Sequence, residues 1–128
     1  IITPHEGEFE RITGKKIVNR SNDAESLADK YDITVVLKGP DTIITDNRKT
    51  YINTSGNPGL AKGGSGDVLA GVIAALISRG YSLIESAKYG VYIHGYTADK
   101  IAEKKSMESI TAEDVIENIG KVIKEFER

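Results

Sequence analysis

The sequence predicts a three-layer α/β domain, on the strength of three observations. Residues 33–38 are β-branched and almost uninterrupted in their apolar character, which is typical of a buried strand in a parallel sheet. Residues 42–45 and 49–53 flank the turn-forming segment 46–48, which predicts an antiparallel hairpin. Three longer segments carry apolar residues at helical spacing, and all of these elements have to share one core. The strand at 33–38 should therefore be central and mostly buried.

The longer helices are expected to begin at residues whose side chains can cap them. Ser21, Ser82 and Thr111 stand at such positions, and the segment after Thr111 is an amphipathic closing helix. Residues 67–77 are apolar on nearly every face, so we expect that helix to be buried on most sides. Gly80 is well placed to end it.

Composition excludes several functional classes. The chain has 128 residues, 17 Lys+Arg and 19 Asp+Glu, a formal net charge of −2, which fits one domain over residues 1–128. The absence of cysteine excludes a disulfide framework, a thiolate metal site and a cysteine nucleophile. Basic residues are scattered, so we expect neither nucleic acid nor a membrane as a partner. With no signal peptide and no apolar run near the ~20 residues that span a bilayer, we expect a cytoplasmic protein.

A glycine-rich loop over residues 57–66 leads directly into the apolar helix. Its glycines allow successive backbone N–H groups to converge, and the helix dipole adds positive potential, so this loop is a candidate phosphate site. Neither the Walker pattern nor the dinucleotide fingerprint fits, because Ala61 and Leu69 stand where those patterns require glycine. A glycine-rich turn without a ligand is the alternative interpretation.

Asp67 stands where that helix begins. A carboxylate beside a bound phosphate could act as the general base that activates a hydroxyl for attack on a phosphoryl group. The alternative is a first-turn aspartate that complements the helix dipole and has no chemical role.

Four ordered motifs carry a family resemblance. They are Thr-Pro-His-Glu-Gly-Glu-Phe at 3–9, Lys-Gly-Pro-Asp-Thr at 38–42, Asn-Pro-Gly with Gly-Gly-Ser-Gly-Asp over 57–67, and Gly-Val-Tyr-Ile-His-Gly at 90–95. Together they resemble the ADP/ATP-dependent NAD(P)H-hydrate dehydratases of the ribokinase-like superfamily. The segment 64–67 alone would indicate only the superfamily, and the flanking motifs narrow it. Ser65 replaces the commoner threonine of the family and keeps the hydroxyl.

The resemblance implies a ribokinase-like α/β/α sandwich, of which this chain is the C-terminal half. It also implies repair of the hydrated coenzymes NADHX and NADPHX to NADH and NADPH, driven by ADP or ATP with Mg²⁺. His5 and Asp67 would contact the hydrate, with Asp67 as the catalytic base, and no residue is assigned as a metal ligand. The residues expected at the nucleotide are Lys38, Gly39, Pro40, Asp41, Thr42, Asn57, Pro58, Gly59, Leu60, Ala61, Lys62, Gly63, Gly64, Ser65 and Gly66.

Several of these residues also have an alternative interpretation as structural residues that bind no ligand. Lys38 could be a strand terminus that reaches solvent, Lys62 a solvated loop lysine, and His5 a turn residue beside a proline. Because the proline stiffens the turn and a short helix over 6–12 should lead away from it, we expect His5 to face the cleft that holds Asp67. His94 is expected to be a packing histidine.

Two other functions compete with hydrate repair. One is a ribokinase-like kinase of a small alcohol, which would stop after phosphorylation, and the segment 3–9 argues against it. The other is a nucleotide-binding half-domain without enzymatic activity. We expect a homo-oligomer, with the N-terminal half of the domain as a separate segment or chain.

Overall fold

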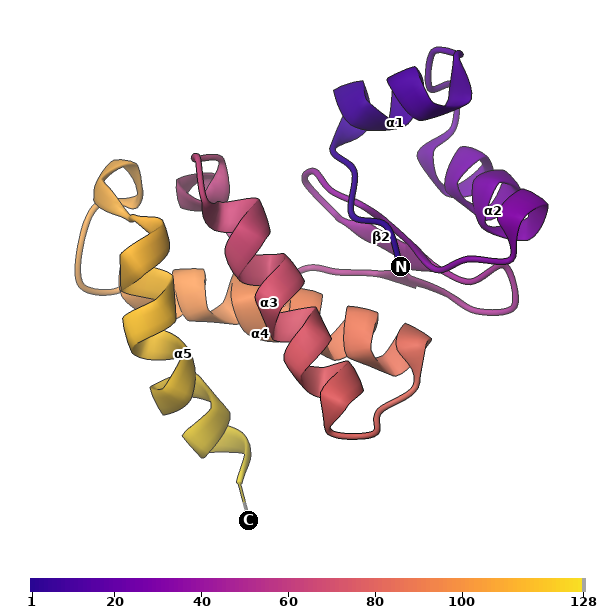
Figure 1. The fold of residues 1–128 in the computed structure, drawn as a ribbon. Coiled ribbons are helices and arrows are strands. Elements are labelled where there is room, and N and C mark those ends of the chain that lie inside the picture. The colour runs from indigo at the N-terminus through magenta and orange to yellow at the C-terminus, as the bar shows by residue number, and fades with distance from the viewer. Residues whose placement is uncertain (128) are drawn as a thin grey trace.

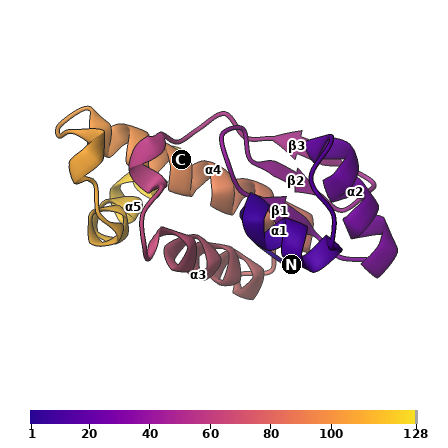
Figure 2. The same cartoon turned by 90° about the horizontal axis from the view of Figure 1, so that it is seen from above.

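The structure, a computed structural model, describes residues 1–127 (Figure 1). Helices α1 and α2 precede a three-stranded sheet, and α3, α4 and α5 follow it. The bounds are α1 Glu6–Thr13, α2 Arg20–Tyr31, β1 Val35–Leu37, β2 Ile43–Thr45, β3 Thr50–Ile52, η1 Pro58–Leu60, α3 Ser65–Ser78, α4 Leu83–Ala102, η2 Met107–Ser109 and α5 Ala112–Phe126. Figure 2 shows α2 at one end of the molecule and α5 at the other, with α3 and α4 between them.

The sheet separates two hydrophobic clusters, which confirms the three-layer prediction. Val35 and Leu37 point from β1 to α1 and α2, where they pack against Phe9. Val36 points to the opposite face and packs with Ile73 of α3 and with residues of α4. This alternation is what a strand with a helical layer on each side requires. All three β1 residues are buried, as expected.

The sheet is mixed rather than parallel. Its strand order is β1-β2-β3 with antiparallel neighbours, and the predicted hairpin is β2–β3 with Ile44 opposite Tyr51. On its other side β1 is bridged in parallel by the start of the chain, at Ile2 and at His5. The prediction of a buried strand in a parallel sheet is therefore confirmed for the burial of β1 and wrong for its neighbour β2, which is antiparallel. β1 is fully buried because β2 and the start of the chain flank it and a helical layer covers each of its faces.

Two helix predictions are wrong in detail. Asn19 rather than Ser21 caps α2, with its side chain accepting a hydrogen bond from the Asn22 N–H at 3.0 Å. The helix α3 is not buried on most sides, since only Ser65, Leu69 and Ile73 are buried along it. It packs on α4 and α5 through one face, and its small residues leave the other face to solvent. The Ser82 and Thr111 caps are confirmed as capping boxes.

Within the described residues, none of the helices has the length and apolar character needed to cross a membrane.

Candidate active site

The carboxyl end of β1 brings together two of the motifs. His5 is bridged in parallel to Lys38, and the Lys38 N–H donates to the Pro4 carbonyl at 2.9 Å. The His5 backbone N–H donates to the Glu8 carboxylate at 2.8 Å, while the imidazole Nδ1 accepts from the Glu8 N–H at 3.1 Å. His5 thereby caps α1, and because Nδ1 is an acceptor, the neutral ring carries its proton on Nε2, which lies 3.6 Å from the Glu8 Oε1.

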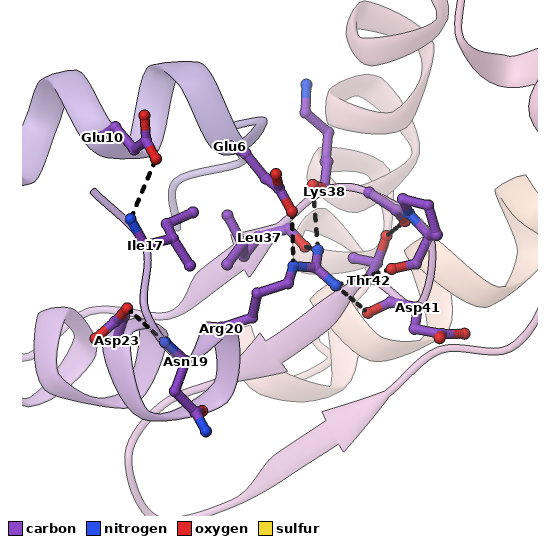
Figure 3. A network of polar contacts seen from close by, with 12 residues as sticks. Glu6, Glu10, Ile17, Asn19, Arg20, Asp23, Leu37, Lys38, Asp41 and Thr42 are labelled. Carbon is purple, nitrogen blue, oxygen red and sulfur yellow. Dashed lines mark hydrogen bonds and ion pairs between the residues drawn. The ribbon is translucent and has the colours of Figure 1, made fainter. Parts of the chain in front are cut away.

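The Lys38 side chain extends from this strand end to the start of α3. Its Nζ lies 3.1 Å from the point that a Cβ atom at Gly66 would occupy. In Figure 3 the side chain points away from the loop that follows it. The hydrogen bond from the His5 backbone lowers the pKa of Glu8, and the nearby charge of Lys38 lowers it further. Lys38 therefore lies between the His5 segment and α3, and in the described chain it forms no ion pair.

The first turn of α3 presents unpaired backbone donors. The N–H groups of Gly63, Gly64, Gly66 and Asp67 donate to no acceptor among residues 1–127, whereas the Ser65 N–H donates to the Lys62 carbonyl at 3.3 Å. Gly64 takes φ of +88° as the N-cap, a conformation that suits glycine, and it provides no capping side chain. The donors, the helix dipole and the Lys38 ammonium all add positive potential at one point, so this site fits an anion.

Asp67 is exposed at the third position of α3. Its carboxylate makes no hydrogen bond and no ion pair with the residues that the structure describes. An aspartate acting only as a helix cap would bond to the free N–H groups of its own first turn, as Asp114 does at Thr111 in α5. The Asp67 carboxylate is thus available to a ligand beside the anion site.

Ser65 and His94 form a buried pair beneath this turn. The Ser65 Oγ and His94 Nε2 atoms are 3.4 Å apart, and both residues are buried. Burial lowers the pKa of His94 to about 4, and the Lys38 charge lowers it too, against a hydrogen bond with the Ser65 backbone that raises it. His94 is therefore neutral near pH 7. It packs in α4 as expected and also contacts the glycine loop.

Hydrogen bonds hold the segment before η1 against α4. The carboxylate of Asp99 accepts from the Gly56 N–H at 2.8 Å and from the Asn57 side-chain amide at 3.0 Å. The Asn57 Oδ1 accepts from the Gly59 N–H at 2.9 Å and so caps η1. A Cβ atom at Gly95 would lie 2.4 Å from the Ser55 Oγ, so α4 needs glycine at that point to let the segment approach.

The two segments expected at the nucleotide lie at the same end of the sheet. The Thr42 carbonyl accepts from the Asn53 N–H at 2.9 Å, which joins the loop 38–42 to the segment leading into η1. Gly39, Pro40 and Asp41 are exposed. This arrangement at the ends of strands, next to a helix N-terminus, is where α/β proteins bind nucleotides.

Comparison with known proteins assigns the chain to a family. A family model described as NAD(P)H-hydrate dehydratase matches residues 1–121. The chain belongs to the NAD(P)H-hydrate dehydratase family. It is 39% identical over 132 residues to the ADP-dependent (S)-NAD(P)H-hydrate dehydratase of Cenarchaeum symbiosum, covering 100% of this chain and 46% of that protein. It is 41% identical over 129 residues to the bifunctional NAD(P)H-hydrate repair enzyme of Thermofilum pendens, covering 97% and 25%.

Solved structures of NAD(P)H-hydrate dehydratases support the same assignment. The ADP/ATP-dependent NAD(P)H-hydrate dehydratase from Bacillus subtilis, co-crystallized with ATP/Mg²⁺, matches with a TM-score of 0.93 and 32% identity, over 98% of this chain and 47% of that one. A ribokinase-like superfamily protein from Enterococcus faecalis matches with a TM-score of 0.75 and 30% identity, over 95% and 43%. The fold is ribokinase-like, and the chain spans about half the length of this dehydratase structure.

Three further residues expected at the nucleotide of this dehydratase family member make contacts within the chain below the glycine loop. The Lys62 Nζ donates to the Ile110 carbonyl at 2.8 Å and to the Glu108 carbonyl, although the residue as a whole is exposed, so a phosphate contact would compete with these two bonds. Gly59 is buried, and Leu60 packs against Ile110. These contacts tie η1 to η2 below the glycine loop.

Sequence reasoning missed two residues of the candidate site, Asp99 and Arg20. Asp99 is one polar position within a long helix and carries no motif of its own. Arg20 follows the cap of α2, where a cation opposes the helix dipole, and that mismatch is a signal that could have pointed to it.

Proposed function

We propose that this chain carries the site at which NAD(P)H hydrates are dehydrated at the expense of ADP or ATP. The observation that carries the proposal is the set of unpaired N–H groups at the start of α3, placed beside the Lys38 ammonium and the free Asp67 carboxylate. A cation at a helix N-terminus is electrostatically unfavourable until an anion binds there. Nucleotide phosphates, held between the loop 38–42 and the glycine loop, would supply that anion.

The residues divide the chemistry between them. The hydrate carries a hydroxyl on its reduced ring, and hydroxide is a poor leaving group. Asp67 would take the hydroxyl proton as the oxygen attacks the terminal phosphoryl group, which leaves the nucleotide one phosphate shorter. The N–H groups of residues 63–66 would stabilise the charge on the transferring phosphoryl group. Elimination of phosphate from the ring, with loss of a ring proton, restores NADH or NADPH.

His5 would contact the hydrate from the other side of Lys38. Its Nδ1 is engaged in capping α1, which fixes the ring, and its Nε2 lies 3.6 Å from the Glu8 Oε1 on an exposed side chain, so the Nε2–H can still serve as a donor to a ligand. A donor of this kind suits a polar group of the hydrate. The cap and the substrate contact use different nitrogens, so the two roles are compatible.

Mg²⁺ would bind together with the nucleotide phosphates and not in a site formed by protein side chains alone. Among the described residues no group of three His, Asp or Glu side chains could hold a metal ion. Mg²⁺ commonly keeps most of its waters and binds through phosphates and one or two carboxylates. Asp67 is a carboxylate in the first turn of α3, beside the anion site, and the ion would neutralise phosphate charge there.

The decisive experiment mixes the chain with NADHX, Mg²⁺ and either ADP or ATP, and follows the return of absorbance from the reduced nicotinamide ring. We expect recovery with at least one nucleotide and none without nucleotide. Nucleotide binding by calorimetry without recovery would instead indicate a nucleotide-binding half-domain. Consumption of nucleotide with accumulation of a phosphorylated product would indicate a kinase.

The coverage of the relatives bears on how this assay is run. The chain covers 46% of the Cenarchaeum symbiosum protein, which supports our expectation that a separate N-terminal half supplies further hydrate contacts. Homo-oligomer formation and a cytoplasmic location stay predictions. The assay should therefore be run at several chain concentrations, because an assembly-dependent activity rises more steeply than the concentration does.

A further inference from the structure

One guanidinium group joins the two segments that the proposed function places around the ligands. Arg20 is the first residue of α2, and its side chain lies among the backbone carbonyls that follow β1 (Figure 3). It also pairs with a carboxylate of α1. Its partners are the carbonyls of Pro40 at 2.8 Å and Asp41 at 3.1 Å from Nη1, the carbonyls of Leu37 at 3.3 Å and Lys38 at 3.4 Å from Nη2, and the Glu6 Oε1 at 3.0 Å from Nε.

The loop is shaped around this side chain. Gly39 takes φ of +154°, and a Cβ atom there would lie 2.7 Å from the Arg20 Nη2. Asp41 takes a positive φ of 55°, which is uncommon for a residue other than glycine. These two backbone conformations turn the carbonyls of the loop inward. Four carbonyl oxygens on one side thus meet the planar fork of donors that only arginine provides.

The position of Arg20 is not explained by α2 itself. A cation in the first turn of a helix meets the positive end of the helix dipole, which is unfavourable. The side chain of Arg20 is only 25% exposed, so it also loses hydration. The four carbonyl hydrogen bonds and the charge of the Glu6 carboxylate offset these costs, although the buried Nε, 3.0 Å from Glu6, lacks hydrogen-bond geometry within the described chain. The guanidinium therefore serves the loop and α1 rather than its own helix.

The Arg20 guanidinium contacts both segments that are predicted to bind ligands. Glu6 directly follows His5, the residue expected at the hydrate, and Lys38 begins the loop expected at the nucleotide. The Lys38 N–H to Pro4 carbonyl bond adds a second link between them. We propose that Arg20 is a positioning residue that holds the His5 segment and the loop 38–42 as one unit, and so sets the binding of both the hydrate and the nucleotide. The ligand part of this proposal rests on the proposed function, whereas the structural part does not.

Two variants distinguish the hydrogen bonds of the guanidinium to the loop from its ion pair with α1. Arg20→Lys keeps the positive charge but cannot span four carbonyls and a carboxylate at once. Glu6→Gln keeps all four carbonyl bonds and removes only the ion pair to α1. The matched control is Lys16→Gln, which breaks the Lys16–Glu10 ion pair at 3.2 Å and leaves the loop untouched.

The first measurement is amide hydrogen exchange on the full chain without ligand. In Arg20→Lys we expect the hydrogen-bonded amides of Lys38 in the loop and of Glu8 and Phe9 at the start of α1 to exchange faster together, by about tenfold or more, because both segments have lost the same anchor. In Lys16→Gln both should match the parent. Unchanged exchange at Lys38 in Arg20→Lys would overturn the proposal whether or not the chain binds nucleotide.

The second measurement separates positioning from simple stability. In the dehydration assay Arg20→Lys should raise the KM for nucleotide and for hydrate by about tenfold each, with a much smaller change in kcat. Glu6→Gln should raise the KM for the hydrate alone. A loss of kcat with both KM values unchanged would overturn the positioning role. If the parent itself neither binds nucleotide nor repairs the hydrate, the proposed function fails, and the exchange experiment still decides the role of Arg20.

Discussion

At the scale of single residues, the candidate site is recognised by polar groups that have no partner inside the protein. The first turn of any helix leaves N–H groups without an intrahelical partner, and at α3 no capping side chain takes them up, so these donors and a nearby carboxylate are available to a ligand. The groups concerned are the N–H groups of Gly64 and Gly66 and the carboxylate of Asp67. The N–H groups suit the oxygen atoms of a phosphate, and the carboxylate suits the hydroxyl group that would be phosphorylated.

Asp67 provides the sharpest test of the chemistry. An amide cannot accept the hydroxyl proton, so Asp67→Asn should lower turnover by about 10² to 10⁴ while the Kd for nucleotide changes little. Glu113→Gln is a matched control, since Glu113 is an exposed first-turn acid of α5. The measurement is turnover with NADHX and nucleotide both saturating. Near-parental turnover of Asp67→Asn would make this residue a helix-start charge with no catalytic part.

His94 predicts a pH dependence of folding stability. Its folded-state pKa of about 4 lies below its usual value of 6.5, so the unfolded chain binds a proton in that range that the folded chain does not. The free energy of unfolding should therefore be fully retained above pH 6.5 and fall as the pH drops toward 4, by about 3 kcal/mol in total. His94→Gln should flatten this slope in urea titrations at several pH values. A parent curve that is flat from pH 6.5 to 4 would contradict the burial argument.

At the scale of elements, the left-handed backbone of Gly64 shapes the turn at the start of α3 that we propose as the phosphate site. Gly64 has φ of +88°, and a Cβ atom there would lie 3.2 Å from the Ala112 Cβ. Gly64→Val should distort the turn that presents the free N–H groups and weaken ADP or ATP binding by at least about tenfold, measured by calorimetry. Gly71→Val is the control within the same helix, because its Cβ would meet nothing within 4 Å. A folded Gly64→Val variant that binds nucleotide as tightly as the parent would exclude this loop as the phosphate site.

The contact between α4 and the segment before η1 predicts a packing effect. In Gly95→Ala the new methyl group would overlap the Ser55 Oγ at 2.4 Å and the Ser55 carbonyl oxygen at 2.8 Å. The carbonyl oxygen belongs to the backbone and cannot rotate away as the hydroxyl can, so the segment must shift, at a cost of about 1–3 kcal/mol. Gly120→Ala in α5 should be neutral or stabilising, since nothing lies within 4 Å of that position. Urea unfolding of both variants gives the comparison.

At the scale of the whole molecule, the sheet separates two of the three hydrophobic clusters of the core, and the third lies beyond them between α4 and α5. Ile43 belongs to the cluster under α1 and α2, and Ile73 to the cluster under α3 and α4. Ile43→Val and Ile73→Val should each lower the free energy of unfolding by about 0.5–1.5 kcal/mol. Because the two sites share no partner, the double variant should equal the sum within about 0.5 kcal/mol. A larger deviation in chemical denaturation would mean that the faces are coupled through β1.

Local sequence patterns by themselves determined much of this molecule. The apolar run that becomes β1, the hairpin, the Ser82 and Thr111 capping boxes and the glycine loop ahead of α3 are all predicted by residues within one or two turns of the chain. The choice of cap at α2 also depends on local geometry, but Asn19 and Ser21 are both good caps, and only the actual path of the chain selects between them.

Only the tertiary structure decided which groups meet. The Lys38 ammonium beside Gly66, the Ser65–His94 pair and the Asp99 carboxylate on Asn57 join residues far apart in sequence, and no local pattern encodes such distances. The exposed face of α3 was missed for the same reason, because an apolar helix is buried only where a neighbour exists to cover it. Hydrophobic periodicity specifies an element and its inner face, whereas the packing of elements sets the positions of charges and free hydrogen-bond donors on which the proposed chemistry depends.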